Sequence, residues 1–243
     1  MNQPIGTSRR GFFGQAVVGV AAAMMMGTAG EAQIVWKENQ WKQPEFNTLL
    51  NLKRTVKLVI DCAVIEDGEV LGAARNALNA MHYGFGVAKN EIQVIAALHG
   101  PANLLNYDDY IWQKYKVGEW FKLDDPDTGK PATRNIFYPS KASGTAGAGL
   151  HYTSQDENNP DSAEQDTSIE GLRARGVRFL SCHFATEAQA RVILKRFSLK
   201  QEPEEIVSEM LAHTVPGALV VPGVVGSVTM LQSVGHYSYL KIA

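Results

Sequence analysis

Cys182 has the clearest capacity for chemistry in this chain of 243 residues, because of what precedes and follows it. Residues 176–182 form a short apolar segment typical of a buried strand, and residues 185–197 carry apolar side chains at helical spacing. A thiol at such a junction faces the N–H groups of the first helical turn, which favour an anion and therefore the nucleophilic thiolate. The alternative is an inert thiol packed in the core, as many free cysteines are.

The composition argues against several other kinds of chemistry. Lysine and arginine number 23 and aspartate and glutamate 25, so there is no surplus of positive charge to bind nucleic acid. The sequence contains neither a glycine-rich phosphate loop nor a Gly-x-Ser-x-Gly nucleophile elbow. Its 6 histidines show no spacing typical of metal ligands. We therefore expect no nucleic-acid partner, no bound metal and no cofactor.

Residues 1–32 have the pattern of a twin-arginine signal peptide. Arg9 and Arg10 precede an apolar run at residues 16–26, and small residues suited to cleavage follow it. The run is too short for a stable membrane span, so we expect none in the mature chain. The predicted destination is the periplasm or the exterior of the cell.

An oxidising destination changes how the cysteines are interpreted. Cys62 and Cys182 are the 2 cysteines of the chain, so they allow one disulfide. Alternatively, Cys182 acts alone while Cys62 packs in the core. The sequence gives no distance between the two thiols, and both alternatives stay open.

Strand and helix patterns alternate along residues 53–243, after a polar lead-in at residues 33–52. Apolar runs typical of buried strands occur at residues 53–62, 91–98, 176–182, 218–221 and 237–242. Helical patterns occur at residues 69–83, 103–110, 168–176, 185–197, 203–213 and 224–232. Alternation of this kind indicates crossover connections and a parallel sheet. We predict a single α/β domain with a five-stranded, mainly parallel sheet and helices on both faces, of flavodoxin-like size.

An insertion at residues 107–167 interrupts this alternation with polar, aromatic and glycine-rich sequence. Within it, residues 119–123 and 132–137 flank a turn that contains Pro and Gly, which predicts a β-hairpin. Asp125 and Asp127 in this turn lack the further oxygen ligands of a calcium loop, so we assign them to the turn. We expect the insertion to lie outside the core of the alternating domain.

Three blocks of the second half together resemble the DsrE/DsrF-like family of sulfur-relay proteins. They are residues 176–182 (GVRFLSC), 215–226 (VPGALVVPGVVG) and 235–241 (GHYSYLK). The first half fits the family more loosely, through the first strand and its helix and through residues 94–100 (VIAALHG). The resemblance covers residues 56–105 and 168–242 and does not extend to the insertion.

The resemblance implies a DsrE-type fold that assembles with copies of itself or with related subunits. It also implies that Cys182 carries sulfur as a persulfide between partner proteins, which requires an accessible thiolate held by nearby donors. His183 and His99 are candidate neighbours of the thiol, His99 because it ends a strand at the edge where open sheets bind ligands. For each histidine the alternative is a surface or packing role.

Two functions therefore remain in view. The first is a periplasmic sulfur carrier or sulfur-compound binding protein that acts through Cys182. The second is a non-enzymatic binding or assembly subunit of a periplasmic redox system, in which Cys182 is structural. In the second, aromatic side chains of the insertion would contact the partner; these are Trp112, Tyr115, Trp120 and Phe121. The export signal and the insertion are departures from the cytoplasmic members of the family.

Overall fold

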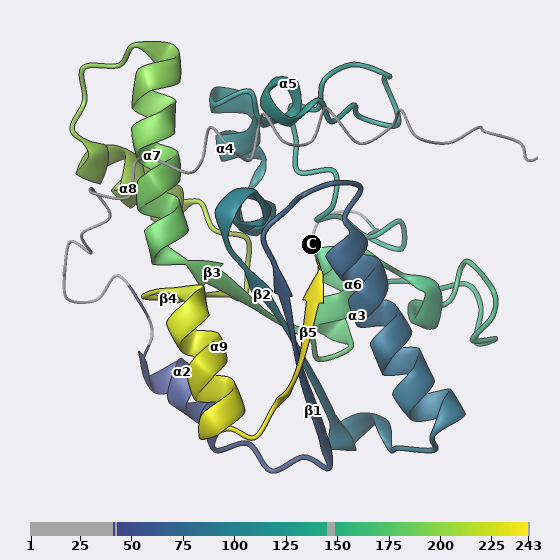
Figure 1. Cartoon of the computed structure of the whole chain (residues 1–243). Helices are drawn as coiled ribbons and strands as arrows, with labels where there is room; N and C mark the ends of the chain where they lie inside the picture. The colour runs from purple at the N-terminus through teal and green to yellow at the C-terminus, as the bar shows by residue number, and fades with distance from the viewer. Residues whose placement is uncertain (1–40, 42, 145–148, 243) are drawn as a thin grey trace, which may run out of the picture.

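Among the described residues, five parallel strands form one sheet in the computed structural model (Figure 1). The structure describes residue 41, residues 43–144 and residues 149–242. The proposed signal peptide therefore lies outside the described residues. The strands are β1 (Val56–Cys62), β2 (Ile92–Leu98), β3 (Arg178–Cys182), β4 (Ala218–Val221) and β5 (Ser238–Ile242). Their order across the sheet is β4-β3-β2-β1-β5, and the predicted α/β fold class is confirmed.

Helices follow the strands in the alternation that the sequence predicts. The α-helices are α2 (Gln43–Leu50), α3 (Glu69–Asn79), α4 (Asp109–Lys114), α5 (Val117–Phe121), α6 (Ile169–Ala174), α7 (His183–Phe197), α8 (Pro203–Ala212) and α9 (Val224–Ser233). A π-helical turn, η1 (Ala80–Gly84), ends α3, and short 3-10 segments are η2 (Lys89–Glu91), η3 (Gly100–Asn106) and η4 (Ala163–Gln165). Among the described residues, none of these helices is both long and apolar enough to cross a membrane.

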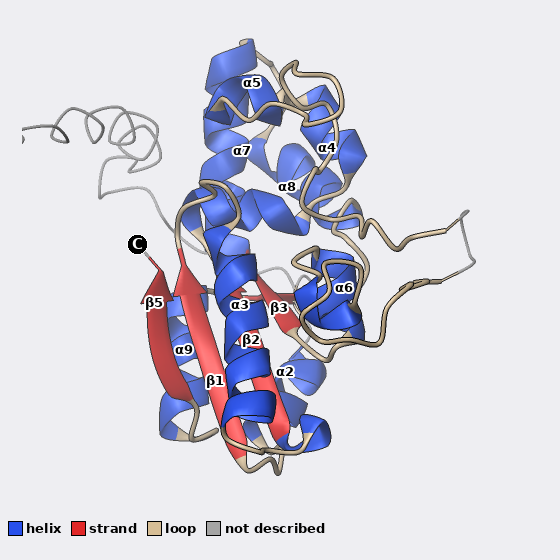
Figure 2. Ribbon diagram, turned by 90° about the vertical axis from the view of Figure 1, so that its right-hand side faces the viewer, coloured by secondary structure: helices blue, strands red, loops and turns tan. Residues whose placement is uncertain are grey.

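Two hydrophobic clusters cover the opposite faces of the sheet. Alternate side chains of β1 divide between them, with Ile60 in one cluster and Val59 in the other. The first cluster also contains core residues of α3 and α6, and the second contains those of α2 and α9. Figure 2 shows α3 and α9 on opposite sides of the strands. The strands carry nearly continuous apolar sequence because both faces are covered.

The lead-in segment also contributes to the core. Phe46 and Leu49 of α2 are each 6% exposed and pack in the cluster that contains α9. The polar composition of residues 33–52 instead favours a position at the surface. The two apolar side chains, spaced three residues apart, give α2 a buried edge.

The connection that follows β3 and the connection that follows β4 run in opposite directions across the sheet. From β1 to β4 each strand is added beside the previous one, whereas the chain then crosses to the far side of β1 to form β5. Accordingly, Ala190 and Ile193 of α7 and the core residues of α8 belong to the first cluster, whereas Ala185 at the start of α7 and the core residues of α9 belong to the second. The carboxyl ends of β3 and β4 therefore flank the topological switch point, where open α/β sheets bind ligands.

The insertion differs from its predicted form. Residues 119–121 of the expected strand at residues 119–123 instead lie in α5 (Val117–Phe121), and the expected hairpin is represented by an antiparallel bridge between Asp124 and Pro131. The helix buries Val117, and Trp112 and Tyr115 nearby are 0% and 2% exposed. Part of the insertion is thus core, because burial of large aromatic side chains outweighs the strand preference of a short segment.

Gly118 of α5 is expected to be intolerant of substitution. A Cβ at this position would lie 2.3 Å from both the backbone N and the backbone O of Ala132, which cannot move independently. Gly118→Ala should lower the free energy of unfolding by about 1–3 kcal/mol, although alanine is the better helix former. The control is Gly226→Ala in α9, where the added Cβ meets nothing within 4 Å. Chemical denaturation of the two variants checks the contrast, and equal stability would contradict it.

Candidate functional site

The thiol of Cys182 lies where two helices begin. Cys182 ends β3 and is the N-cap residue of α7, and its Sγ accepts a hydrogen bond from the Ala185 N–H at 3.4 Å. Sγ also accepts a hydrogen bond from the N–H of Val224, the first residue of α9, at 3.4 Å. Two sets of N-terminal N–H groups therefore converge on one sulfur atom, an arrangement that favours negative charge there.

Local sequence holds the two helix starts together. Pro222 and Gly223 separate β4 from α9, and the Phe184 N–H donates to the Pro222 carbonyl at 3.2 Å. Gly223 leaves room for the neighbouring ring, since a Cβ there would lie 2.7 Å from Phe184. The register of β3 with β4 pairs Cys182 with Val221, so the starts of α7 and α9 lie side by side at the ends of these two strands.

Burial opposes the effect of the helix ends on the thiol. The side chain of Cys182 belongs to the cluster on the α9 face, and the residue is 5% exposed. Burial raises the pKa of the Cys182 thiol above its usual value, and the N–H groups of Val224, Ala185 and Phe184 offset part of that rise. The resting group is therefore a shielded thiol, with donors already in place for an anion.

A buried polar network anchors the backbone of Cys182. Asn103 of η3 accepts hydrogen bonds through Oδ1 from the Cys182 N–H at 2.8 Å and from the Ser181 hydroxyl at 3.0 Å. Its Nδ2 lies 3.0 Å from the Tyr107 hydroxyl, which is 2.6 Å from Thr186 Oγ1. All five residues are fully buried except for the 5% exposure of Cys182. The network fixes the end of β3 relative to η3 and α7.

Sequence reasoning did not identify Asn103. The residue is a single asparagine after a strand end, and its partners on β3 and α7 lie 78 to 86 positions further along the chain. The available signal was a polar residue five positions after the end of the predicted strand at residues 91–98 and two positions after Pro101. Such a residue is common in loops and does not by itself predict a buried network.

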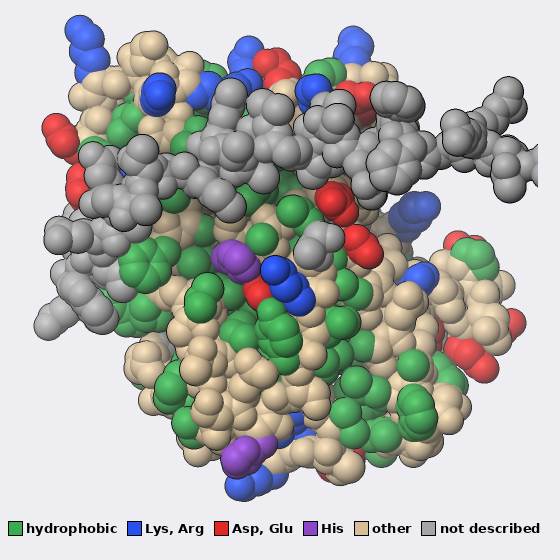
Figure 3. Space-filling model, in the orientation of Figure 1, with side chains coloured by type: hydrophobic (Ala, Val, Ile, Leu, Met, Phe, Trp, Pro, Cys, Tyr) green, Lys and Arg blue, Asp and Glu red, His purple; other side chains and the backbone are tan. Residues whose placement is uncertain are grey.

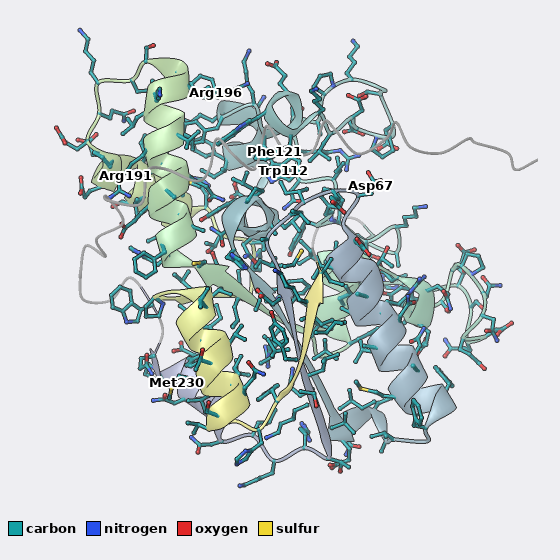
Figure 4. All side chains as sticks on the ribbon, in the orientation of Figure 1. Asp67, Trp112, Phe121, Arg191, Arg196 and Met230 are labelled. Atoms are coloured by element: carbon teal, nitrogen blue, oxygen red, sulfur yellow. The ribbon has the colours of Figure 1, made fainter. Side chains whose placement is uncertain are left out.

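His183 follows Cys182 but its ring contacts other groups. Nδ1 lies 3.2 Å from Glu187 Oε1, one turn along α7. The ring of Trp41 meets the His183 ring edge-on, with 5.6 Å between the ring centroids. Burial lowers the pKa of His183, and Glu187 offsets part of this change. Arg191, labelled in Figure 4, places Nη2 3.6 Å from Glu187 Oε2 on the same helix. These contacts link the His183 ring to Glu187 and Trp41.

His99 lies at the same carboxyl end of the strands as Cys182, and its side chain contacts β1 rather than β3. It follows Leu98, which pairs with Ser181, so its backbone is level with that of Cys182. Its Nε2 lies 2.9 Å from Asp61 Oδ1 on β1, and Asp61 Oδ2 accepts a hydrogen bond from the Tyr239 hydroxyl at 2.9 Å. His99 is therefore part of a separate polar group at the ends of β1 and β5.

Asp61 is expected to add an acid-sensitive contribution to stability. Burial would raise the pKa of Asp61, but hydrogen bonds from His99 and Tyr239 and the charges of His99 and Lys241 lower it overall. A lowered pKa stabilises the fold above the unfolded value of about 3.9, and this contribution is lost as the pH falls through the folded value. Asp61→Asn should therefore show a weaker loss of stability below about pH 4 than the parent protein. Denaturant titrations at several acidic pH values measure this, and identical acid slopes would contradict the assignment.

Cys62 lies on the other face of the sheet from Cys182. It belongs to the cluster that contains α3, and both cysteines are free thiols. Its thiol donates to the Val64 carbonyl at 3.2 Å, and burial raises the pKa of Cys62 to about 11. Cys62 therefore matches the alternative of a packed, protonated thiol, and the disulfide alternative does not hold in this structure.

Among the described residues, no group of three or more His, Cys, Asp or Glu side chains is placed to hold a metal ion. Asp125 instead accepts two hydrogen bonds from Arg134, at 2.7 Å and 2.9 Å, as part of the turn.

Comparison with known proteins finds no matching family model, no matching curated protein and no matching solved structure. The arrangement around Cys182 therefore carries the functional argument.

Proposed function

We propose that this chain is an exported protein of the DsrE/DsrF-like type that carries sulfur as a persulfide on Cys182. The observation that carries the proposal is the convergence of the Ala185 and Val224 N–H groups on Cys182 Sγ at the switch point of the sheet. These donors suit a thiolate or a persulfide anion more than a buried neutral thiol. The five-stranded parallel sheet, with a cysteine at the end of β3, supports the same proposal.

The proposed step is an exchange of sulfur without a change in total oxidation state. The Cys182 thiolate attacks the terminal sulfur of a donor persulfide, and the bond between the two donor sulfurs breaks. The donor leaves as a thiolate, and a new sulfur–sulfur bond joins the transferred atom to Cys182 Sγ. The proton of the resting thiol passes to solvent or to the departing thiolate. Transfer to an acceptor thiol reverses the same steps.

The burial of Cys182 suits an oxidising compartment. A thiol that is 5% exposed and has a raised pKa reacts slowly with small oxidants, because the thiolate is the reactive form. Sulfur transfer then requires a local opening that lets the donor reach Sγ. Helix α2 contributes Phe46 and Leu49 to the same hydrophobic cluster as Cys182. Export to the periplasm through residues 1–32 is part of this proposal.

The proposed partners are other copies of the chain or related subunits, and a protein that donates or accepts sulfur. Strand β5 is an edge strand, and its Tyr239 and Leu240 are 43% and 40% exposed. Val225, at the start of α9, is 73% exposed. Figure 3 shows hydrophobic side chains across the middle of this face and charged side chains gathered toward the end that carries α5 and α7. An exposed parallel edge with apolar side chains favours association.

Replacement of Cys182 tests the sulfur-carrier function. The purified protein is treated with an inorganic polysulfide, and the persulfide is quantified with a thiol-blocking reagent. Cys182→Ser should lose the persulfide completely, because no other thiol has converging helix N–H donors. Cys62→Ser is the matched control and should keep it. Persulfide that persists in Cys182→Ser, or is lost only in Cys62→Ser, would contradict the proposal.

A structural role for Cys182 in a binding or assembly subunit is the second candidate, and the burial of the thiol favours it. In that case Cys182→Ser should leave partner binding unchanged. Trp112 and Tyr115 are buried within the chain, so of the four aromatic side chains considered for this contact, Trp120 and Phe121 retain partly exposed surface for a partner. Partner capture by the full-length chain with and without Cys182→Ser separates the two candidates.

A further inference from the structure

A cavity of about 810 Å³ lies between the start of α3 and the second half of the insertion. Its walls come from residues 67–75 of α3 and its preceding turn, from residues 136–142 and from residues 151–168. Helix α3 packs on the face of the sheet opposite Cys182, so the cavity and the thiol are separate features. Figure 4 shows Asp67, one of the lining residues, at the start of α3. The volume is in the range of pockets that bind small organic molecules.

Hydrogen bonds fix the wall that the insertion contributes. Asp166 accepts from the Ser140 hydroxyl at 2.5 Å, from the Tyr152 hydroxyl at 2.9 Å and from the Ser168 N–H at 2.7 Å. Burial would raise the pKa of Asp166, yet these donors lower it overall, so the carboxylate remains charged. The Ile169 N–H also donates to the Phe137 carbonyl at 2.9 Å. The wall is therefore preorganised rather than a loose surface loop.

The cavity has an apolar side formed by α3 and Phe137. Leu71 and Phe137 line it, and the Phe137 ring lies against Gly68, where an added Cβ would be 2.8 Å away. Gly72 also lines the cavity, and a Cβ at this position would meet nothing within 4 Å. Helix α3 thus presents bare backbone at Gly72 to a cavity that the Phe137 ring also lines. This surface can accept the flat apolar side of a ligand.

The polar side of the cavity carries both signs of charge. Asp67, Glu69, Asp161 and Asp166 contribute carboxylates, whereas Arg75 and Lys141 contribute cations. Arg75 is held in place, since its Nη1 donates to Gln165 Oε1 at 3.1 Å. A phosphate or a polyamine would meet groups of its own sign as well as of the opposite sign. A neutral ligand with many hydroxyl groups would use the carboxylates as acceptors and the guanidinium as a donor.

We propose that this cavity binds a neutral, hydroxyl-rich small molecule of the mono- or disaccharide class. The apolar side beside Phe137 and Gly72 takes the C–H face of a sugar ring. The carboxylates and Arg75 take its hydroxyl groups. The site is independent of the proposed sulfur chemistry, because none of its lining residues belongs to the group around Cys182.

Calorimetric titration of the full-length protein with maltose, cellobiose and N,N′-diacetylchitobiose tests the proposal. At least one of these sugars should bind saturably. Gly72→Leu should weaken that binding at least about tenfold, because the new side chain enters open space at a position that lines the cavity. Gly226→Leu is the matched control, since it adds the same side chain to an equally open helical position outside the cavity, and it should bind as the parent does. Cys182→Ser should also bind as the parent does.

Several results would overturn the proposal. One is the absence of saturable binding by all three sugars. Another is sugar binding that Gly72→Leu leaves unchanged, provided that circular dichroism shows this variant to be folded. A third is binding of triglycine or inorganic phosphate, used as charged probes, in place of the sugars. Loss of binding in Cys182→Ser would place the sugar at the thiol instead, and would contradict the separation of the two sites.

Discussion

Replacing Asn103 by alanine is expected to lower the free energy of unfolding by about 2–4 kcal/mol. The substitution removes the acceptor that Oδ1 provides to both the Cys182 N–H and the Ser181 hydroxyl. Both donors are buried and would lose this partner, and a small void would form beside Tyr107 and Thr186. A buried donor without a partner destabilises a fold more than a hydrogen bond ordinarily stabilises it.

Denaturant unfolding of Asn103→Ala measures this loss. Asn76→Ala is the control, because Asn76 is exposed on α3 and alanine favours a helix. The control should unfold at the same or a slightly higher denaturant concentration than the parent. If Asn103→Ala were destabilised by less than about 0.5 kcal/mol, the network would not hold the end of β3 as we describe.

Replacing Val224 by proline is expected to slow alkylation of Cys182 near pH 8 by about 10-fold to 100-fold. Proline removes the N–H that Val224 donates to Sγ at 3.4 Å. The first position of a helix tolerates proline, and Gly223 already has an extended backbone with φ −158° and ψ 128°. The variant therefore loses one donor to the thiolate while α9 is retained. The pKa of the Cys182 thiol should rise further as a result.

Val224→Ala is the matched variant, because it shortens the same buried side chain and keeps the N–H. Alkylation rates at Cys182 are followed by peptide mass spectrometry over a range of pH, which separates Cys182 from Cys62. Slow alkylation in the proline variant alone assigns the effect to the N–H group. Equal rates in the two variants would show that the start of α9 does not stabilise the thiolate.

Much of the fold could be predicted from short-range patterns. The apolar runs at β1 and β2 are nearly continuous because both faces of these strands are buried, and continuous runs are easy to find. The helical pattern at residues 168–176 also agrees with α6, whose N-cap residue Ser168 accepts a hydrogen bond through Oγ from the Gly171 N–H at 2.9 Å. The position of Cys182 between a strand and a helix follows from the same local reasoning.

Features that depend on distant residues could not be predicted. The helix α5 replaces the expected strand because Val117 packs in the core and Gly118 contacts the backbone of Ala132. The second donor to Cys182 comes from α9, 42 positions away, and depends on how β4 is added to the sheet. The contact of His99 with Asp61 likewise depends on the pairing of β2 with β1. Such contacts arise from the tertiary arrangement, which periodicity does not encode.

The most direct test of the account is the mass of the Cys182 peptide after sulfur loading. The folded wild-type protein is treated with an inorganic polysulfide, exposed thiols are blocked, and the digested protein is analysed by tandem mass spectrometry. We predict an added mass of about 32 Da, one sulfur atom, on the peptide that contains Cys182 and none on the peptide that contains Cys62. An unmodified Cys182 peptide, under conditions that modify a control persulfide carrier, would show that Cys182 does not carry sulfur.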